Sequence, residues 1–513
     1  MATTKTSLLC NRFGGIRKRS ATFSSELITC SDCQNIELFY TGVNSGVGIR
    51  TAKGNSKLLE IGESIVNMFE SVQNGTTYCF LHTETETAGS IYKYDIGSNT
   101  KELIYTGLTV TGKSSGVTVA QGWTDQFIFS NGEEILNIQI GRTSEDGEAE
   151  DVKALVLKDR DGRVVKGLGL ITFDGRLWIF NKNVLWYSRQ ENYSDFSTND
   201  PDTKTNAGYI EFVQDITAIY NYLGSVAVFH SDCSTLISLE SDSTFSRGDD
   251  SPGGCASYNS LVFHGTELYF FDNTKKGVFC FKQVVNGDKT LGDNVAIDVQ
   301  DLLMDIDLAD LHKIKTLSVV TSEKNEIWFL LPSKDSTYST ILIFDYICGE
   351  WVKRKSNKLN CLAIIEGKIL SAGSSIFEEY IGYKFNNTFI PSYYNCSIMN
   401  LGADNTLKIL YFPPRVTMDM TRSTEFFVKY IKNYNYLKPS REKLIKTKTI
   451  KNALYWNVGN WGVNYWASEN STVIYKLSSA TFKSLEIEFF TAEEGQEFSI
   501  MNIEFSKIKV KQV

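Results

Sequence analysis

The chain has 513 residues, of which 42% are hydrophobic and 22% charged, and its formal net charge is −8. This length exceeds one ordinary hydrophobic core, so we expect two or more domains, and the composition excludes a disordered chain. The acidic balance disfavours a protein whose main task is to bind DNA regardless of sequence, because such proteins are usually basic. No apolar run approaches the ~20 residues of a membrane span, and no secretory signal is visible, so we expect folding in a cytoplasm.

The first pattern along the chain is a set of ten cysteines. Most stand alone in apolar stretches, as Cys280 does in GVFCFKQV, where a free thiol acts as a small hydrophobe. Only Cys30 and Cys33 form a C-x-x-C. A zinc site needs a second pair of ligands, and the nearest histidine, His82, is far along the chain. We therefore expect no metal and no cofactor.

Helical patterns are almost missing. The best candidates are short: residues 62–71 (GESIVNMFES) and 299–312 (VQDLLMDIDLADLH). Elsewhere, short apolar runs rich in aromatic residues are broken by Gly, Asn, Asp and Ser, and the chain has only 7 prolines. This pattern indicates many short strands and an all-β fold: a sandwich, a barrel or a propeller.

One strand–turn–strand unit recurs along the chain. Its instances are residues 74–95, 123–141, 169–188, 216–239, 258–281, 317–351 and 359–381. Most neighbouring units are separated by the ~40–50 residues that separate the blades of a β-propeller. Such a meander cannot bury its two faces alone, whereas a ring of them can. We predict a propeller of six to eight blades over residues 58–384.

The third unit carries two tryptophans on one small hairpin, RLWIFNKNVLWYS. We expect Trp178 and Trp186 to pack between blades. The alternative is a binding platform for a ligand.

The ends of the chain differ from the middle. Residues 1–57 are predicted to form an extended N-terminal arm and platform strands, and residues 385–513 a β-sandwich-like platform domain. Residues 429–451 form a basic strip with eight Lys or Arg and one Glu, whereas residues 144–151 (SEDGEAED) carry five acids. The acidic run is interpreted as a solvated loop.

A search for catalytic patterns finds none. His230 and His264 stand at matching ends of predicted strands (VAVFH and SLVFH), which indicates repeat geometry. The nucleophile-elbow, zinc-protease, phosphate-loop and dinucleotide motifs are missing from the sequence. A glycosidase would need two carboxylates at a defined separation, which a sequence does not give. We predict that the chain is not an enzyme.

Three stretches carry a family resemblance. They are the N-terminal NRFGGIRKRSATF, which leads to a Gln-Asn, a strand and a Gly-rich turn before Arg50 and Gly54; the hairpin GRLWIFNKNVLWYSRQENYSDF (175–196); and YWNVGNWGVNYW (455–466). With these stretches the chain resembles the tail nozzle, or tail tube-tip, proteins of short-tailed bacteriophages.

The resemblance implies a virion protein assembled in the bacterial cytoplasm: a propeller on a β-platform, in a homo-hexameric ring below the portal and adaptor. Such a ring guides DNA, contacts it transiently and offers attachment sites to fibres or receptor-binding proteins. The inter-subunit candidates are Phe13, Gly14, Gly15, Trp456, Trp461 and Trp466. The candidates for contact with a neighbour or with DNA phosphates are Lys438, Arg441, Lys443, Lys446, Lys448 and Lys451. A frayed terminus and a solvated face are the alternatives for these two groups.

The rival hypothesis is a carbohydrate-binding or carbohydrate-cleaving propeller. Carboxylates and aromatic platforms lining one cleft would favour it, whereas tryptophans on packing faces, one per blade, would favour the tail protein. A bacterial protein-interaction propeller is a third hypothesis, and it leaves the Phe-Gly-Gly and Trp-Gly stretches unexplained.

Overall fold

In the computed structural model, the chain folds into two compact units. It describes residues 3–5, 8–17, 27–41, 46–122, 124–144, 146, 150–200, 205–240, 244–283, 289–304, 306–397, 407–410, 414–419, 425–433, 435–437, 439, 442–446, 453–454, 465–466, 470–474, 481–505 and 508–511. The propeller unit comprises Ser56–Thr340 and Asn357–Glu379. The platform unit comprises Met1–Asn55, Ile341–Ser356 and Tyr380–Val513. The predicted domain boundaries at residues 57/58 and 384/385 stay predictions.

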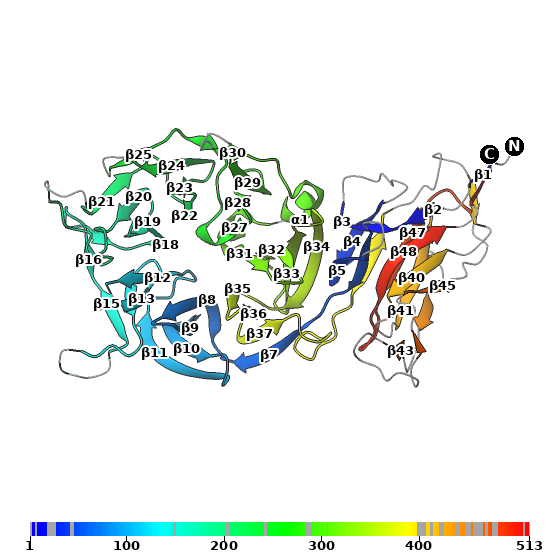
Figure 1. Cartoon of the computed structure of the whole chain (residues 1–513), viewed down its shortest axis with the longest axis horizontal. Coiled ribbons are helices and arrows are strands. Elements are labelled where there is room, and N and C mark those ends of the chain that lie inside the picture. The colour runs from blue at the N-terminus through cyan, green and yellow to red at the C-terminus, as the bar shows by residue number, and fades with distance from the viewer. Residues whose placement is uncertain are drawn as a thin grey trace. The chain divides into compact units, whose positions relative to one another are not determined.

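Seven small sheets form the blades of a propeller (Figure 1). Blades one to three are β8 (Ser64–Gln73), β9 (Thr76–Glu84), β10 (Gly89–Asp95) and β11 (Thr100–Leu108); β12 (Ser115–Gln121), β13 (Thr124–Ser130), β14 (Ile135–Ile138) and β15 (Val152–Leu155); and β18 (Leu168–Phe173), β19 (Arg176–Asn181), β20 (Val184–Tyr187) and β21 (Gly208–Glu211). A two-stranded pair, β16 (Leu157–Lys158) and β17 (Val164–Val165), lies in the chain between blades two and three.

Blades four to six follow in the same order. They are β22 (Ala218–Tyr222), β23 (Ser225–Phe229), β24 (Cys233–Leu239) and β25 (Phe245–Arg247), with β26 (Ser251–Pro252) beside β24; β27 (Leu261–His264), β28 (Glu267–Asp272), β29 (Gly277–Gln283) and β30 (Lys289–Leu291); and β31 (Lys315–Val320), β32 (Asn325–Leu331), β33 (Tyr338–Asp345) and β34 (Glu350–Asn357). By its contacts, the Ile341–Ser356 segment of the sixth sheet is grouped with the platform unit.

The seventh blade closes the ring with a strand from the other end of the propeller sequence. It consists of β35 (Cys361–Ile365), β36 (Lys368–Ala372) and β37 (Ser375–Glu379), and its outer strand is β7 (Asn55–Glu60). Each of the seven predicted units supplies strands to one blade, so the propeller and the range of blade numbers are confirmed.

Apolar side chains between neighbouring blades form the core of the ring. The cluster that joins blades seven and one contains Ile65, Met68, Leu81, Cys361 and Leu370, all buried. A strand of alternating inward and outward residues can supply such a cluster on each of its faces. Blades one and seven are therefore held together by this packing, in addition to the pairing of β7 with β37.

The two tryptophans of the third blade are packing residues, as predicted. Trp178 is fully buried in the cluster shared by blades three and four, and its indole N–H donates to the carbonyl of Phe173 at 3.2 Å. Trp186 packs between blades two and three and donates to the Asp159 carboxylate at 3.2 Å. The alternative, an exposed aromatic platform, does not hold for these two residues because their side chains are buried.

The prediction of a helix at residues 62–71 is wrong, because this segment forms β8. β8 is buried on both of its faces, with Ile65, Val66, Met68, Ser71 and Gln73 among its buried residues. A strand buried on both faces lacks the two-residue alternation of a half-buried strand, so its apolar residues can fall at the spacing of a helix face. The second prediction, a helix at residues 299–312, is confirmed in part. The segment holds three short helices, η2 (Ile297–Val299), α1 (Gln300–Met304) and η3 (Leu308–Lys313), and Ile306 and Asp307 before η3 are not helical. A further short helix, η1 (Tyr258–Ser260), precedes β27.

His230 and His264 do not occupy matching positions. His230 follows β23, the second strand of its blade, whereas His264 ends β27, the first strand of the next blade. The first and second strands of a blade are antiparallel, so their ends lie on opposite faces of the ring. His230 Nδ1 lies 3.0 Å from the carbonyl oxygen of Asp215, and His264 Nδ1 lies 2.8 Å from Ser318 Oγ. Their similar sequence context therefore does not reflect repeat geometry.

The platform unit is built on a 12-stranded sheet. Ten strands follow in the order β42 (Lys443–Lys446), β41 (Glu425–Lys432), β47 (Leu485–Phe490), β38 (Tyr393–Cys396), β4 (Leu27–Gln34), β3 (Arg12–Ile16), β6 (Val47–Thr51), β48 (Ser499–Phe505), β40 (Arg415–Asp419) and β45 (Asn470–Ile474), with β2 (Leu8–Cys10) beside β48 and β5 (Ile36–Tyr40) beside β6. A second sheet consists of β1 (Thr3–Lys5), β49 (Ile508–Lys511), β39 (Leu407–Leu410) and β46 (Thr481–Phe482), and β43 (Ala453–Leu454) pairs with β44 (Tyr465–Trp466).

Strands from before the propeller lie together in the middle of this sheet, and strands from after the propeller flank them on both sides. β4 pairs with β38, and β6 pairs with β48, so the propeller is inserted in the chain between two parts of one sheet. The predicted fold class, an all-β chain with a propeller and a separate β-platform, is confirmed. Across the described part of the chain, no helix has the length and apolarity needed to cross a membrane.

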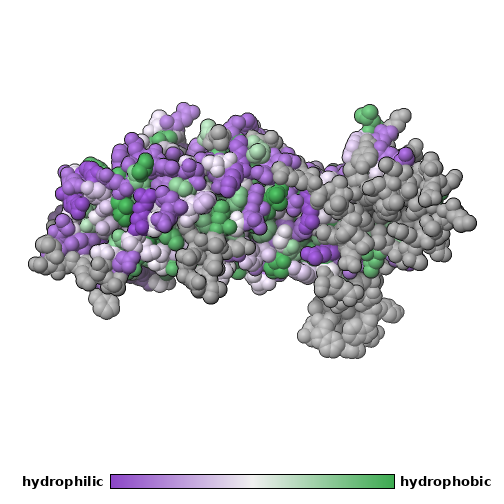
Figure 2. All heavy atoms as spheres, turned by 90° about the horizontal axis from the view of Figure 1, so that it is seen from above, coloured by the Kyte–Doolittle hydropathy of each residue, from purple (hydrophilic) through white to green (hydrophobic). Residues whose placement is uncertain are grey.

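The face drawn in Figure 2 is mainly hydrophilic where the residues are described, and apolar residues are scattered among the polar ones. Extended apolar patches mark docking sites for other proteins. Among the described residues on this face, none forms such a patch.

Candidate functional site

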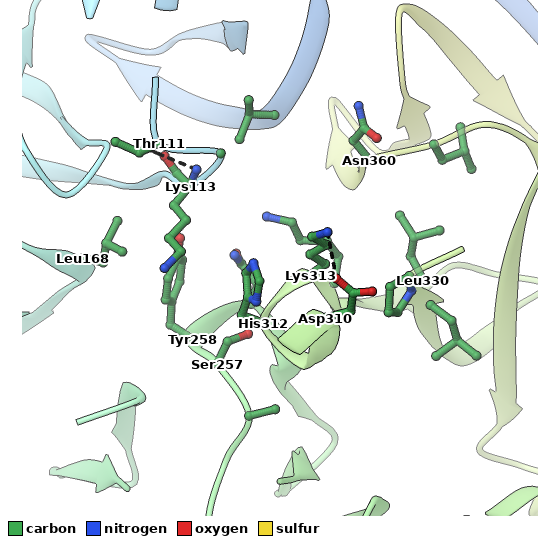
Figure 3. A pocket seen from close by; sticks show the side chains of 18 of the residues that line it. Thr111, Lys113, Leu168, Ser257, Tyr258, Asp310, His312, Lys313, Leu330 and Asn360 are labelled. Atoms are coloured by element: carbon green, nitrogen blue, oxygen red, sulfur yellow. Dashed lines mark hydrogen bonds and ion pairs between the residues drawn. The ribbon is translucent and has the colours of Figure 1, made fainter. Parts of the chain in front are cut away.

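The candidate site is a cavity of about 650 Å³ in the propeller unit (Figure 3). All seven blades line it with residues at or just before the start of their first strands, for example Ser64, Lys113, Leu168, Thr217, Tyr258, Lys315 and Asn360. Neighbouring first strands contact one another, and β22 and β27 share one hydrophobic cluster, so the first strands surround the axis of the propeller. The cavity therefore lies at one mouth of the central channel, where segments far apart in the sequence meet.

The charged lining of this cavity is mostly basic. It contains four lysines, two carboxylates and one histidine: Lys113, Lys313, Lys315, Lys358, Glu84, Asp310 and His312. The chain as a whole carries a net charge of −8, so the cavity is a local exception. A concave site with one prevailing sign of charge attracts ligands of the opposite sign.

Lys315 is the first residue of β31, and its side chain is only 9% exposed. Within the described part of the chain, its ammonium group has neither a hydrogen-bond partner nor an ion-pair partner. Burial lowers the pKa of Lys315 to about 8, while the nearby Cys361 thiol acts in the opposite direction. Burial lowers the pKa of His82 to about 3, and the positive charge of Lys315 contributes to this lowering. Cys361 and His82 belong to blades seven and one, so the charge of Lys315 in blade six acts on groups of two other blades.

Lys113 stands on a short loop that Glu84 holds in place. The Glu84 carboxylate accepts hydrogen bonds from the backbone N–H groups of Thr111 at 2.9 Å and Gly112 at 3.0 and 2.9 Å. The loop is fixed on its other side by the Tyr258 hydroxyl, which donates to the Ser114 carbonyl at 3.2 Å. Figure 3 shows the exposed side chain of Lys113 pointing into the cavity.

His312 and Lys313 stand on η3 at the cavity. Burial and the charge of Lys113 lower the pKa of His312, so the imidazole is neutral at pH 7. Lys313 forms an ion pair with Asp310 at 2.8 Å, drawn as a dashed line in Figure 3. The hydrogen bond from Lys313 lowers the pKa of Asp310. This pair is therefore charged on both sides and nearly neutral as a unit.

Lys358 holds a third position on the rim. Its ammonium donates to the carbonyls of Ser333 at 2.9 Å and Asp335 at 2.7 Å, which use two of its three N–H groups. The positive charge is retained, because carbonyl groups solvate it without neutralising it. Chemically, the arrangement is suited to binding an anion.

Comparisons with known proteins show no family for this chain. No protein-family model matches the chain, and no curated protein matches it. Similar solved structures include a streptogramin B lyase (10% identity, TM-score 0.39, 67% of this chain and 96% of that chain), the virginiamycin B lyase of Staphylococcus aureus (10%, 0.38, 67% and 99%) and the N-terminal domain of Nup159 (10%, 0.37, 64% and 94%). Likeness at this level carries no statement about activity.

The Phe-Gly-Gly segment lies within β3 of the platform sheet. Phe13 is buried against Tyr394, with ring centroids 5.7 Å apart, and the Tyr394 hydroxyl lies 2.8 Å from the carbonyl oxygen of Gly14. A Cβ at Gly15 would lie 2.2 Å from the backbone oxygen of Trp351, so only glycine fits there without a shift. The segment thus makes contacts within its own chain, and its place at a subunit boundary stays a prediction.

Most of the other predicted contact residues lie outside the described residues: Trp456, Trp461, Lys438, Arg441, Lys448 and Lys451. Trp466 ends the short strand β44. Lys443 and Lys446 lie on β42, with exposed side chains, and Lys446 forms an ion pair with Glu425 at 2.8 Å. Their contact with a neighbour or with DNA stays a prediction.

Cys30 and Cys33 are buried, free thiols on β4, and burial raises the pKa of Cys30 well above its ordinary value. Within the described ranges, no group of three or more His, Cys, Asp or Glu side chains is placed to hold a metal ion.

The cavity lysines were not singled out from the sequence. Lys113, Lys315 and Lys358 are separated by more than 40 residues at the closest and share no motif. The one available signal is positional: each lies at or within three residues of the start of a first blade strand. Only the closed ring brings these positions together.

Proposed function

We propose that this chain is a structural subunit of a short bacteriophage tail, which forms with other copies a ring-shaped nozzle below the portal and adaptor. The observation that carries the proposal is the position of the segment that resembles such proteins. Residues 11–54 contain β3, β4, β5 and β6, which lie within the 12-stranded platform sheet. The propeller follows in the chain before the sheet is resumed, and a propeller combined with a platform is what the resemblance implies.

A structural role requires no catalytic group, and the cavity favours that reading over glycoside cleavage. A glycosidase needs a carboxylic acid with a raised pKa beside a second carboxylate. Of the two carboxylates at the cavity, Asp310 has a lowered pKa, and Glu84 accepts backbone hydrogen bonds with both oxygens. Both carboxylates make structural contacts: Asp310 pairs with Lys313, and Glu84 holds the loop at Thr111 and Gly112.

Sugar binding is also disfavoured by where the tryptophans lie. Those with described side chains, Trp178, Trp186, Trp328 and Trp351, are at most 6% exposed. They occupy blades three and six, rather than one place in each blade, but all of them pack inside the fold. The cavity wall has Tyr258 and Phe180 as its aromatic residues and no tryptophan. This supports the tail protein over the carbohydrate-binding alternative.

In the proposed ring, the acidic character of the chain suits a channel that DNA must pass without being held. Exposed Lys443 and Lys446 would face an acidic neighbour or touch phosphates at one level of the channel. Fibres or receptor-binding proteins would attach to the outside of the ring.

The experiment is quantitative mass spectrometry of phage particles purified from the source culture, with the portal protein as the internal standard. We expect this chain at half the copy number of the portal, and electron microscopy of the same particles should show density for it in the tail. The control is a particle preparation from a strain in which the coding sequence carries an early stop codon, where we expect heads without complete tails.

Two results would overturn the proposal. The chain could be missing from particles that contain portal and adaptor proteins. Alternatively, particles made with the early stop codon could be complete and infectious. In either case the purified chain should be screened for glycan binding and cleavage.

A further inference from the structure

The cavity of the propeller has a feature that a purely structural ring subunit does not need. Lys315 places a charged group in a side-chain position that is nine-tenths buried, at the wall of the cavity, without a partner in the described chain. A buried charge without a partner is costly for the fold, and such groups are normally paired with an opposite charge. The missing partner of Lys315 is therefore expected to come from outside the chain.

The charges around Lys315 determine what this partner is. Lys313 is compensated by Asp310, and Glu84 offsets one further positive charge. Of the four lysines, the equivalent of two positive charges is left over, and His312 adds none while it is neutral. A phosphate monoester carries a charge of about −1.5 to −2 at neutral pH and offers three acceptor oxygens, so it matches this excess.

The donors are arranged for such a group. Lys113 and Lys315 have no acceptor in the described chain, and Lys358 has one N–H group left after its two hydrogen bonds to carbonyls. The three lysines come from loops or strands of three different blades and line the same cavity. The cavity, at about 650 Å³, is of the size that holds small organic ligands, ~300–1,000 Å³.

We propose that the central cavity binds a small organic molecule through a phosphate group, with Lys315 as the buried anchor and Lys113 and Lys358 at the rim. The remainder of the ligand occupies the part of the cavity lined by Leu168, Phe180 and Tyr258. The ring-subunit proposal does not enter this inference, since the site lies within one propeller unit.

The test is isothermal titration calorimetry of the full chain at pH 7 and low salt. The probes are inorganic phosphate, glucose 6-phosphate and AMP, each with its parent without phosphate where one exists, glucose or adenosine. We expect the phosphate-bearing probes to bind and the parents not to bind. If an organic phosphate binds more tightly than inorganic phosphate, the rest of the ligand contributes, as proposed; if inorganic phosphate binds best, the site is one for the free ion and the organic ligand is wrong.

Matched variants locate the binding. Lys315→Met keeps the length of the side chain and removes its charge, and we expect it to weaken binding roughly tenfold or more, as loss of a charge-assisted hydrogen bond does. Lys113→Met, on an exposed loop, is the second variant and should weaken binding without disturbing the core. The control is Lys153→Met, on the exposed outer strand β15 away from the cavity, which should bind as the unaltered chain does.

The proposal is wrong if no phosphate-bearing probe binds at millimolar concentration, or if Lys315→Met and Lys113→Met bind as tightly as Lys153→Met. An equal loss in all three variants would indicate a general charge effect and would equally overturn it.

Discussion

Lys315 shows how a single side chain can favour binding at the expense of stability. Its ammonium lies in a 9% exposed position, and burial lowers its pKa to about 8 from an ordinary value of 10.5. Because the fold disfavours the charged form of Lys315, the free energy of unfolding depends on pH through this group. Stabilising variants at such positions commonly lose function.

The first prediction concerns Lys315→Met without any ligand. Below pH 8, Lys315 is charged in both the folded and the unfolded chain, so its burial cost is present in full and the variant should be more stable. Between about pH 8 and 10.5 the folded chain loses the proton while the unfolded chain keeps it, so the unaltered chain gains stability as pH rises. We therefore expect the advantage of the variant to be largest at pH 7 and to shrink toward pH 10.

The measurement is urea unfolding of both chains at pH 7, 8, 9 and 10. The quantity compared is the difference between their free energies of unfolding at each pH. The neighbours do not titrate in the folded state over this range, because the pKa of His82 is about 3 and that of Cys361 about 12. A difference that stays constant or grows with pH would show that the buried ammonium is not destabilising.

At the scale of the element, β3 depends on a close approach between two backbones. The Gly15 N–H donates to the Glu350 carboxylate at 2.9 Å, and Arg17 reaches the same carboxylate at 2.7 Å. Trp351 follows Glu350 on β34 and occupies the space where a Cβ of residue 15 would stand. All these groups belong to the platform unit.

We predict that Gly15→Ala destabilises the chain by at least ~2 kcal/mol, because the added methyl group meets backbone atoms that have no rotamer to change. The matched control is Gly97→Ala in an exposed turn, where the nearest atom to an added Cβ is the flexible Asp95 carboxylate oxygen at 3.3 Å. Urea midpoints of the two variants give the comparison. Equal urea midpoints for Gly15→Ala and Gly97→Ala would contradict the close packing of β3 against β34.

The elements of this chain differ in how far they can be predicted from the sequence. The seven blades could be predicted because each hairpin combines apolar runs with its own turn residues, which are local properties. The strand β8 was missed because it is buried on both faces, so its apolar residues do not alternate with polar ones as those of a half-buried strand do. The cavity could not be predicted, since Lys113, Lys315 and Lys358 meet only through closure of the ring, which is a property of the whole chain.

At the scale of the whole molecule, the platform unit is made of segments on both sides of the propeller. The pairs β4–β38 and β6–β48 join strands that are more than 350 residues apart in the chain. A cut between propeller and the following platform strands would therefore not release a separate domain, because backbone hydrogen bonds hold the pieces in one sheet.

We predict that the two fragments stay associated after such a cut. A protease site inserted between Asn387 and Thr388 lies in a tight turn that the pairing of Phe385 with Thr388 closes, at two exposed residues. After cleavage, the two fragments should elute together in size-exclusion chromatography and separate only in denaturant. The uncut insertion variant is the control for folding. Elution of the C-terminal fragment on its own, with β-sheet circular dichroism, would contradict the interleaved sheet.

The closure of the seventh blade by β7 also sets an order of events on the ribosome. β7 is synthesised before every other strand of the propeller, yet its partner β37 emerges more than 300 residues later. At ~5–20 residues per second, the ring stays open for at least ~15 s, with the edges of its first and latest blades unpaired. In the platform sheet, β4 waits longer still for β38, and β6 for β48. Nascent chains of this protein should therefore be clients of chaperones that shield sheet edges until translation has passed the last blade.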